Sequence, residues 1–277
     1  MVCPTVQVAL FHFDRSYGSA RQEPPHDARD VPQACISELF LFAVLSPLLV
    51  ADLERDFCTT LVTSDASPSY GFGVSVRETD PAVIKHLATL SEDHGDYLRL
   101  TLEEGDEREK ERRGTPVRLP FAQADFVDIL NIKAKHISHA GAMEAEAVLL
   151  AIKWVIRSSS RFATRLVLGV DAKAVLHAIM KGRSSAPSLT RIIKAIAAHC
   201  LAANLLVHPI YIPSESNPAD GPSRGVRKRP PGRRLLKPLG FSYVERAEER
   251  RVRSLAFFRA FGEESYSDAS SALESGW

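Results

Sequence analysis

The chain has 277 residues, of which 45% are hydrophobic and 25% charged, values typical of a globular protein with a buried core. Its net charge of +1 excludes neither acidic nor basic partners, because a neutral total can hide local patches. The four cysteines lie far apart, which argues against a zinc knuckle and a disulfide-rich secreted domain and favours an intracellular, reducing compartment.

The N-terminal part predicts no membrane segment. No basic stretch precedes an apolar core at the N-terminus, which argues against a signal peptide. The most apolar run, residues 39–51, is too short to span a bilayer and contains Pro47. We expect a poorly ordered arm over residues 1–36 and a helical connection over residues 37–57, with one helix on each side of Pro47.

Residues 61–76 predict two strands joined in a hairpin. A short apolar run leads into Asp65, turn-forming residues follow, and Phe72, Val74 and Val76 then alternate with smaller or polar residues. The bare backbone at Gly71 and Gly73 leaves room for a metal and a phosphate chain beside Asp65. Alternatively, this aspartate only hydrogen-bonds its own turn.

Residues 78–131 form an expected insertion to which the sequence assigns no chemistry. A short strand is predicted over residues 115–119, and the charge-rich stretch 103–113 indicates a solvated helix or loop. A third strand of the main sheet is expected over residues 133–138. The helix predicted over residues 143–157 buries one stripe, and its 100° per residue places Glu144 on that stripe and Glu146 about 200° further round.

Residues 166–212 predict alternating strands and helices. A buried strand ends at Asp171, helices follow over residues 172–180 and 187–203, and a strand over residues 205–212 is expected at an edge because it contains Pro209. A loop and a short helix carrying Asp220 come next. This order predicts an α/β sheet whose last strands are parallel.

Four carboxylates fall where such a sheet would bring them together, namely Asp65, Glu144, Asp171 and Asp220. They would repel one another unless cations neutralise them, and oxygen ligands favour Mg²⁺ or Mn²⁺ over zinc. Taken singly, each has an ordinary explanation: Asp171 as a helix cap, Glu144 as a first-turn acid, Asp220 as a turn residue. Their order and spacing together favour a site.

The chain resembles the ribonuclease H domain of reverse transcriptases, most closely that of DIRS-like, tyrosine-recombinase retrotransposons. The resemblance covers residues 61–225, within an expected domain of residues 58–225. It depends on these segments: Ser64-Asp65-Ala66-Ser67, Gly71-Phe72-Gly73, Glu144 to Ala151, Val170-Asp171, Lys181 to Ser185, and Tyr211 to Asp220 continuing to Pro222-Ser223-Arg224.

The resemblance implies a ribonuclease H-like mixed five-stranded sheet with flanking helices and cleavage of the RNA strand of RNA–DNA hybrids. It assigns two Mg²⁺ (or Mn²⁺) ions to the four carboxylates, and contact with nucleic acid to Ser67, Lys181, Arg183 and Arg224. Hybrids are recognised mainly by shape and backbone, so little sequence preference is expected. No Tyr-x-Asp-Asp polymerase motif occurs, which leaves a separate reverse transcriptase as an expected partner and a retroelement origin as an expectation.

Departures from the family leave other functions open. The loop before Asp220 lacks the histidine that cellular ribonucleases H carry, which favours a catalytically weak or inactive nucleic-acid-binding module as the alternative. A related nuclease that prefers DNA is a third candidate. We expect His208 to be packed within a strand, and the His136/His139 pair to be unrelated to metal binding. Residues 226–277 are expected to form a basic linker, for phosphate contact or merely solvated, followed by a charged helix or tail.

Overall fold

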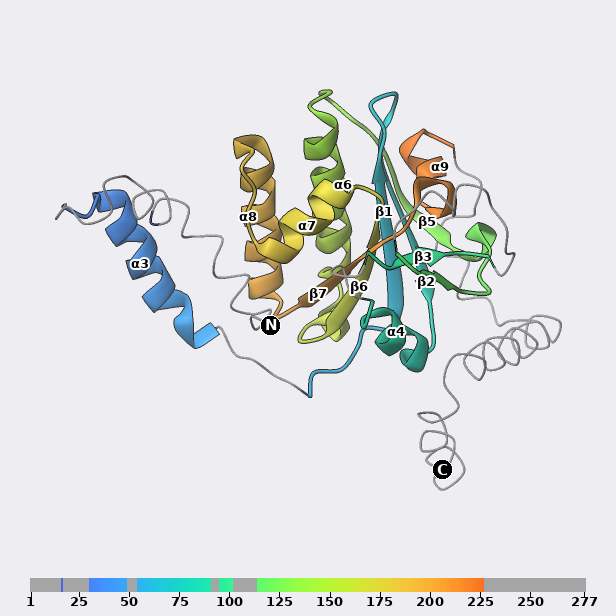
Figure 1. Ribbon diagram of the computed structural model, residues 1–277, viewed down its shortest axis with the longest axis horizontal. Coiled ribbons are helices and arrows are strands. Elements are labelled where there is room, and N and C mark those ends of the chain that lie inside the picture. Colours follow the sequence, from blue (N-terminus) through green and yellow to red (C-terminus); the bar gives the residue numbers. More distant parts are fainter. Residues whose placement is uncertain (1–15, 17–29, 49–53, 91–94, 102–113, 227–277) are drawn as a thin grey trace, which may run out of the picture.

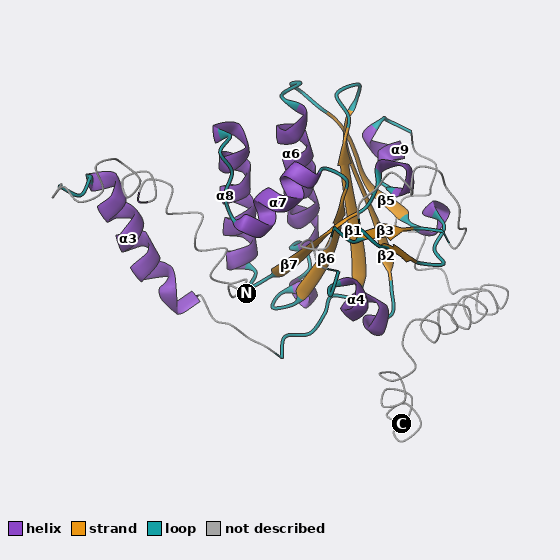
Figure 2. Cartoon of the chain, in the orientation of Figure 1, coloured by secondary structure: helices purple, strands orange, loops and turns teal. Residues whose placement is uncertain are grey.

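The computed structural model describes residue 16 and residues 30–48, 54–90, 95–101 and 114–226. The expected N-terminal arm (residues 1–36) and the expected basic linker and tail (residues 226–277) therefore lie largely outside the described residues. Residues 103–113 lie wholly outside them. The described chain is a mixed α/β structure in which helices flank a single sheet (Figures 1 and 2). No helix among these residues is long and apolar enough to cross a membrane.

The sheet has seven strands in the order β4-β3-β7-β6-β1-β2-β5, rather than the five expected. Strand β2 is antiparallel to both its neighbours, and the remaining pairings are parallel. Strands β3 and β4 lie wholly within the expected insertion, and β5 begins inside it. The strands are β1 (Thr60–Ala66), β2 (Gly71–Glu78), β3 (Tyr97–Arg99), β4 (Pro116–Arg118), β5 (Val127–Lys133), β6 (Arg165–Val170) and β7 (Leu206–Tyr211).

One face of the sheet is covered by three helices, and the main hydrophobic core lies between them and the strands (Figure 1). These helices are α6 (Ala140–Val155), α7 (Lys173–Lys181) and α8 (Pro187–Ala202). Helix α6 has the amphipathic stripe that its sequence predicts: Val148, Ala151 and Val155 are fully buried against β1, β2 and α8. Burying such side chains contributes about 1.5–3 kcal/mol for each large one, so this layer positions the site firmly.

A second core covers the opposite face and is built largely by the insertion. Ile84, Leu87 and Phe126 are buried against Leu61 of β1 and Val167 of β6. Because strand residues alternate between faces, Leu61 and Val167 point here while their neighbours point into the main core. The elements on this side are α4 (Pro81–Leu87), the 3₁₀ turns η2 (Gln123–Asp125) and η4 (Ser214–Ser216), and the short helix α9 (Asp220–Ser223); a further 3₁₀ turn, η3 (Ser159–Arg161), precedes β6.

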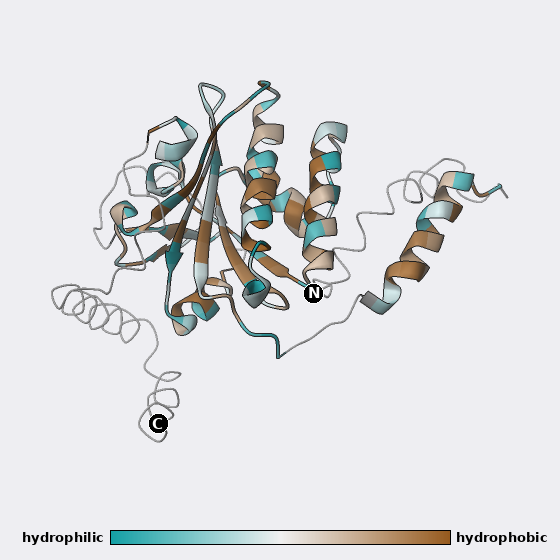
Figure 3. Cartoon of the chain, turned by 180° about the vertical axis from the view of Figure 1, so that it is seen from behind, coloured by the Kyte–Doolittle hydropathy of each residue, from teal (hydrophilic) through white to brown (hydrophobic). Residues whose placement is uncertain are grey.

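The N-terminal helix α3 (Gln33–Leu45) is followed by the 3₁₀ turn η1 (Ser46–Leu48) and begins before residue 37, where the helical connection was expected to start. Within the helix, the Ser37 hydroxyl donates to the Gln33 carbonyl. Figure 3 shows that the central turns of α3 are hydrophobic. Several apolar side chains of this helix are exposed: Ile36, Leu39, Phe40, Leu41 and Val44. The second helix expected before residue 57 is wrong in its described part, because Phe57 forms a bridge with Arg165.

Two predicted strands differ from the observed ones. The third strand of the main sheet, β5, spans residues 127–133 rather than 133–138. Strand β7 lies between β6 and β3 in the strand order, not at an edge, although β3 pairs with it only at Tyr97 and Tyr211. Pro209 therefore has no pairing partner in β3, so its missing N–H leaves no hydrogen bond to that strand unmade.

Candidate metal centre

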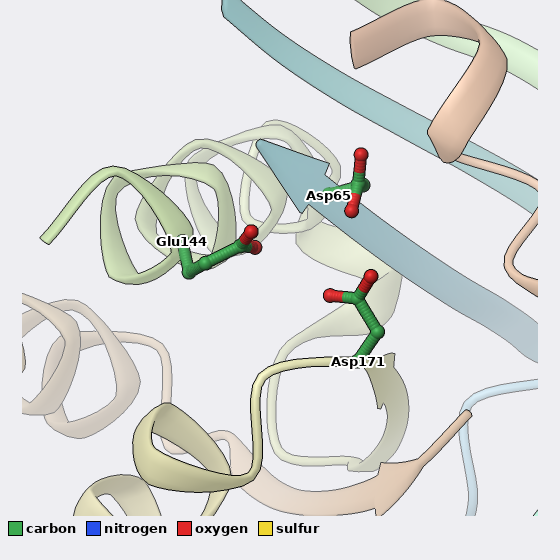
Figure 4. Close-up of side chains that lie close together, drawn as sticks. All are labelled: Asp65, Glu144 and Asp171. Carbon is green, nitrogen blue, oxygen red and sulfur yellow. The ribbon is translucent and has the colours of Figure 1, made fainter. Parts of the chain in front are cut away.

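Asp65, Glu144 and Asp171 come together at one end of the sheet, as the sequence predicts. One carboxylate oxygen from each lies within 4.8 Å of the other two. Figure 4 shows the three side chains pointing toward one another from strand β1, helix α6 and the segment that follows β6. The ends of two parallel neighbouring strands and the first turns of α6 therefore meet at a single point.

Local structure fixes each of these three acids. Asp65 pairs with Gly73 across the hairpin, and Asp171 directly follows the last residue of β6. Glu144 is the fifth residue of α6, whose first turn is capped by His139 through its Nδ1, which accepts from the Gly141 N–H at 3.2 Å. His139 therefore has a structural role at the start of α6.

Burial and mutual repulsion raise the pKa of two of the acids. Burial first, and then the charge of Asp171, raises the pKa of Asp65 to about 9, against a hydrogen bond from Ser223 that favours ionisation. The same two causes raise the pKa of Glu144 to about 8, with the Ala66 backbone acting in the opposite direction. Without a cation, the cluster therefore cannot be fully ionised at neutral pH.

Two hydroxyl groups on the segment that follows β7 bind two of the acids. The Ser223 hydroxyl donates a short hydrogen bond to Asp65 Oδ2, and the Ser214 hydroxyl donates to Asp171 Oδ2 at 2.8 Å. The other oxygen of Asp171, Oδ1, is buried and has no hydrogen-bond partner among the described residues. A buried carboxylate oxygen without a donor, beside two further acids, fits a bound cation. The triad could therefore hold a metal ion.

Asp220 is next to the cluster but not part of it. Its Oδ1 accepts from Arg224 Nε at 2.9 Å and lies 2.8 Å from Arg224 Nη2, and it is only one turn from Ser223. The four-acid site expected from the sequence is therefore a group of three in this structure, with the fourth carboxylate held by a cation of the chain itself.

The other predicted binding residues differ in how accessible they are. Ser67 is buried in the hairpin turn, where its N–H donates to the Gly71 carbonyl and its hydroxyl pairs with Ser69. Lys181 and Arg183 are exposed on either side of Gly182, which ends α7 in a left-handed conformation. His208 is packed against Phe57 as expected, and burial lowers its pKa to about 4.

Three residues that the sequence interpretation passed over also shape the site. Ser214 and Ser223 bind the acids directly, and Asn217 donates from Nδ2 to the Ser64 carbonyl at 3.0 Å, beside Asp65. All three lie in the segment with the most specific resemblance, so that segment contained the signal. Comparison with protein-family models, with curated proteins and with solved structures gave no match in any of the three searches.

Proposed function

We propose that this protein is a metal-dependent endonuclease of the ribonuclease H type, which cleaves the RNA strand of RNA–DNA hybrids. The observation that supports the proposal most strongly is the convergence of Asp65, Glu144 and Asp171 within 4.8 Å, with one oxygen of Asp171 buried and without a donor. Further support comes from the strand order. Without β3 and β4, the order β5-β2-β1-β6-β7 is that of a five-stranded mixed sheet.

In the proposed enzyme, Asp65, Glu144 and Asp171 would hold Mg²⁺ or Mn²⁺, and Asp220 would contribute to a second ion once that ion replaced Arg224 as its partner. Bound divalent ions of this kind lower the pKa of a water and stabilise the leaving oxygen in phosphodiester hydrolysis. The chain's own contribution is to fix the acids: Ser223 orients Asp65 and Ser214 orients Asp171. Arg224, Lys181 and Arg183 are exposed cations that would contact the phosphates of the hybrid.

A labelled RNA–DNA hybrid incubated with the full chain and Mg²⁺ or Mn²⁺ tests this function. We expect the RNA strand to be cut, and cutting to fall to background in Asp65→Asn, which keeps the size and the Ser223 contact of the side chain while removing its charge. Double-stranded RNA and double-stranded DNA should be cut far more slowly. A folded wild-type protein that cuts none of them with either metal would contradict the proposal.

A second function is favoured by the Asp220–Arg224 pair. Because Arg224 holds the fourth carboxylate away from the cluster, a module that binds hybrids without turnover is the alternative. The same assay separates the two, because binding without cleavage over a wide range of Mg²⁺ and Mn²⁺ concentrations would support the module. Preferred cutting of duplex DNA would instead support a related nuclease with another substrate.

A further inference from the structure

The insertion between β2 and β5 carries a buried charged side chain that contacts the segment after β7. Arg99, the last residue of β3, is only 3% exposed. Its Nη1 donates to Glu215 Oε1 at 2.8 Å and to Ser216 Oγ at 3.2 Å. From the same insertion, Gln123 Nε2 donates to the Glu215 carbonyl at 2.8 Å. Both contacts fall on one short stretch, residues 213–217, which we call the site loop.

Each side chain of the site loop beyond Pro213 then has a defined partner. Ser214 donates to Asp171 at one end of the loop, and Asn217 donates to the Ser64 carbonyl at the other. Between them, Glu215 and Ser216 accept hydrogen bonds from Arg99. Asn217 is 1% exposed and also accepts from the Ala219 N–H at 3.1 Å, on the way to α9 and Ser223. The insertion holds the middle of the loop, while one end of the loop contacts Asp171 and the other contacts the residue before Asp65.

We propose that Arg99 is a positioning residue for the metal centre, and that the insertion serves to brace the site loop. The inference rests on the proposed function only in taking the three acids as metal ligands. Through Glu215 and Ser216, Arg99 fixes the backbone from which Ser214 orients Asp171 and Asn217 steadies the end of β1. Residues that orient ligands typically change metal affinity by 10–100-fold when removed.

The competing explanation is that the Arg99–Glu215 pair only stabilises the fold, and the chain offers a matched control. Arg77 also joins the insertion through an ion pair, with its Nη1 3.3 Å from Asp125 Oδ2, and its guanidinium stacks on Phe121 at 3.8 Å. Its side chain and that of Asp125 are 15% and 14% exposed. Because Asp125 lies in the same 3₁₀ turn as Gln123, which donates to Glu215, loss of Arg77 should lower stability and weaken Mn²⁺ binding less than loss of Arg99 does.

The experiment compares Arg99→Met, Ser214→Ala and Arg77→Met with the wild type in the full chain. Mn²⁺ affinity is measured by electron paramagnetic resonance of the free ion, and thermal unfolding is measured without metal. We expect Arg99→Met and Ser214→Ala to weaken Mn²⁺ binding about tenfold, and Arg77→Met to lower the melting temperature with a smaller loss of Mn²⁺ affinity. Arg99→Lys should recover part of the loss, because its ammonium restores a charged donor but not the planar geometry with which Arg99 Nη1 reaches both Glu215 and Ser216.

Several outcomes separate this inference from the proposed function. Unchanged Mn²⁺ affinity in a folded Arg99→Met, or an equal loss in Arg77→Met, would overturn the role of Arg99 while leaving the nuclease proposal intact. If Arg99→Met does not fold, then Arg99→Lys and Ser214→Ala decide, and wild-type affinity in both would overturn the inference. Where the wild type cleaves hybrids, raised Mg²⁺ should restore cleavage in Arg99→Met. A wild type that binds Mn²⁺ without cleaving removes the proposed function but not this test.

Discussion

Glu144 and Glu146 are two positions apart on α6, and only Glu144 takes part in the cluster with Asp65 and Asp171. Replacing Glu144 by Gln removes a ligand charge and also the repulsion that raises its pKa. We therefore expect Glu144→Gln to abolish stabilisation by Mg²⁺ and to leave the metal-free protein at least as stable as the wild type. Thermal unfolding with and without Mg²⁺ measures both effects.

Glu146→Gln is the matched control, because it makes the same chemical change on the same helix, away from the cluster. It should keep the full Mg²⁺-dependent rise in melting temperature. The assignment of Glu144 would be wrong if the two variants lost that rise equally, or if Glu146→Gln alone lost it.

At this scale, the sequence predicts what helix geometry determines and misses what tertiary contact determines. The choice of Glu144 over Glu146 followed from 100° per residue, which is a local property of the chain. The hydroxyl contacts of Ser214 and Ser223 depend on how a loop and a short helix approach strands far away in the sequence. The pairing of Asp220 with Arg224 is local, at four residues' separation, and was open to prediction.

Helix α9 is held against the hairpin by the close approach of its backbone to Gly73 of β2. A Cβ built on Gly73 would lie 2.4 Å from the Ala219 carbonyl oxygen and 2.5 Å from the Ser223 nitrogen. Gly73→Ala must therefore push α9 outward, and with it the Ser223 hydroxyl that binds Asp65. We expect a loss of about 1–3 kcal/mol of stability and weaker Mn²⁺ binding, measured by denaturant unfolding and electron paramagnetic resonance.

Gly141 provides the control for this substitution. It lies in the first turn of α6, and a Cβ there would meet only the His139 ring, at an ordinary 3.6 Å. Gly141→Ala should leave both stability and Mn²⁺ affinity within error of the wild type or slightly raised. Equal Mn²⁺ affinity in Gly73→Ala and Gly141→Ala would show that α9 does not position the site.

Among the elements, the hairpin, the helices around the site and β4, which matches the strand predicted over residues 115–119, were predictable, whereas the rest of the insertion and β5 were not. Strand β3 has three residues, too few to show a period, and it forms only through pairing with distant segments. In β5, Asp128 is buried because Ser75 of β2 donates to it, and the pairing of these strands shifts at this point. A buried polar residue and an irregular register hide the alternation that a strand prediction needs.

Taken as a whole, the molecule places a cluster of buried acids at one end of its sheet, and this makes its stability depend on pH. The unfolded chain ionises Asp65 and Glu144 near their ordinary values of 3.8 and 4.5, but the folded chain does so only near 9 and 8. Between these values the folded state binds more protons than the unfolded state. The free energy of unfolding of the metal-free protein therefore falls as pH rises through this window.

The titration of other groups limits the pH range in which the acids of the cluster determine how the free energy of unfolding changes with pH. Burial lowers the pKa of His208 from 6.5 to about 4, so the unfolded state binds its proton first and stability rises with pH below 6.5. Burial raises the pKa of Cys200 from 9.0 to about 12, which adds a loss of stability near pH 9 and above. Between about pH 6.5 and 8, the acids of the cluster dominate.

We accordingly expect the metal-free protein to lose stability from pH 6.5 to 8, measured by urea unfolding at fixed ionic strength. Saturating Mg²⁺ should remove this loss, because bound cations keep the acids ionised, and Mg²⁺ affinity should rise up to tenfold per pH unit for each proton displaced. The variant Asp65→Asn with Glu144→Gln should show neither slope nor response to Mg²⁺. A wild type whose metal-free stability is flat or rises over this range would mean that the acids do not meet in a shared, buried centre.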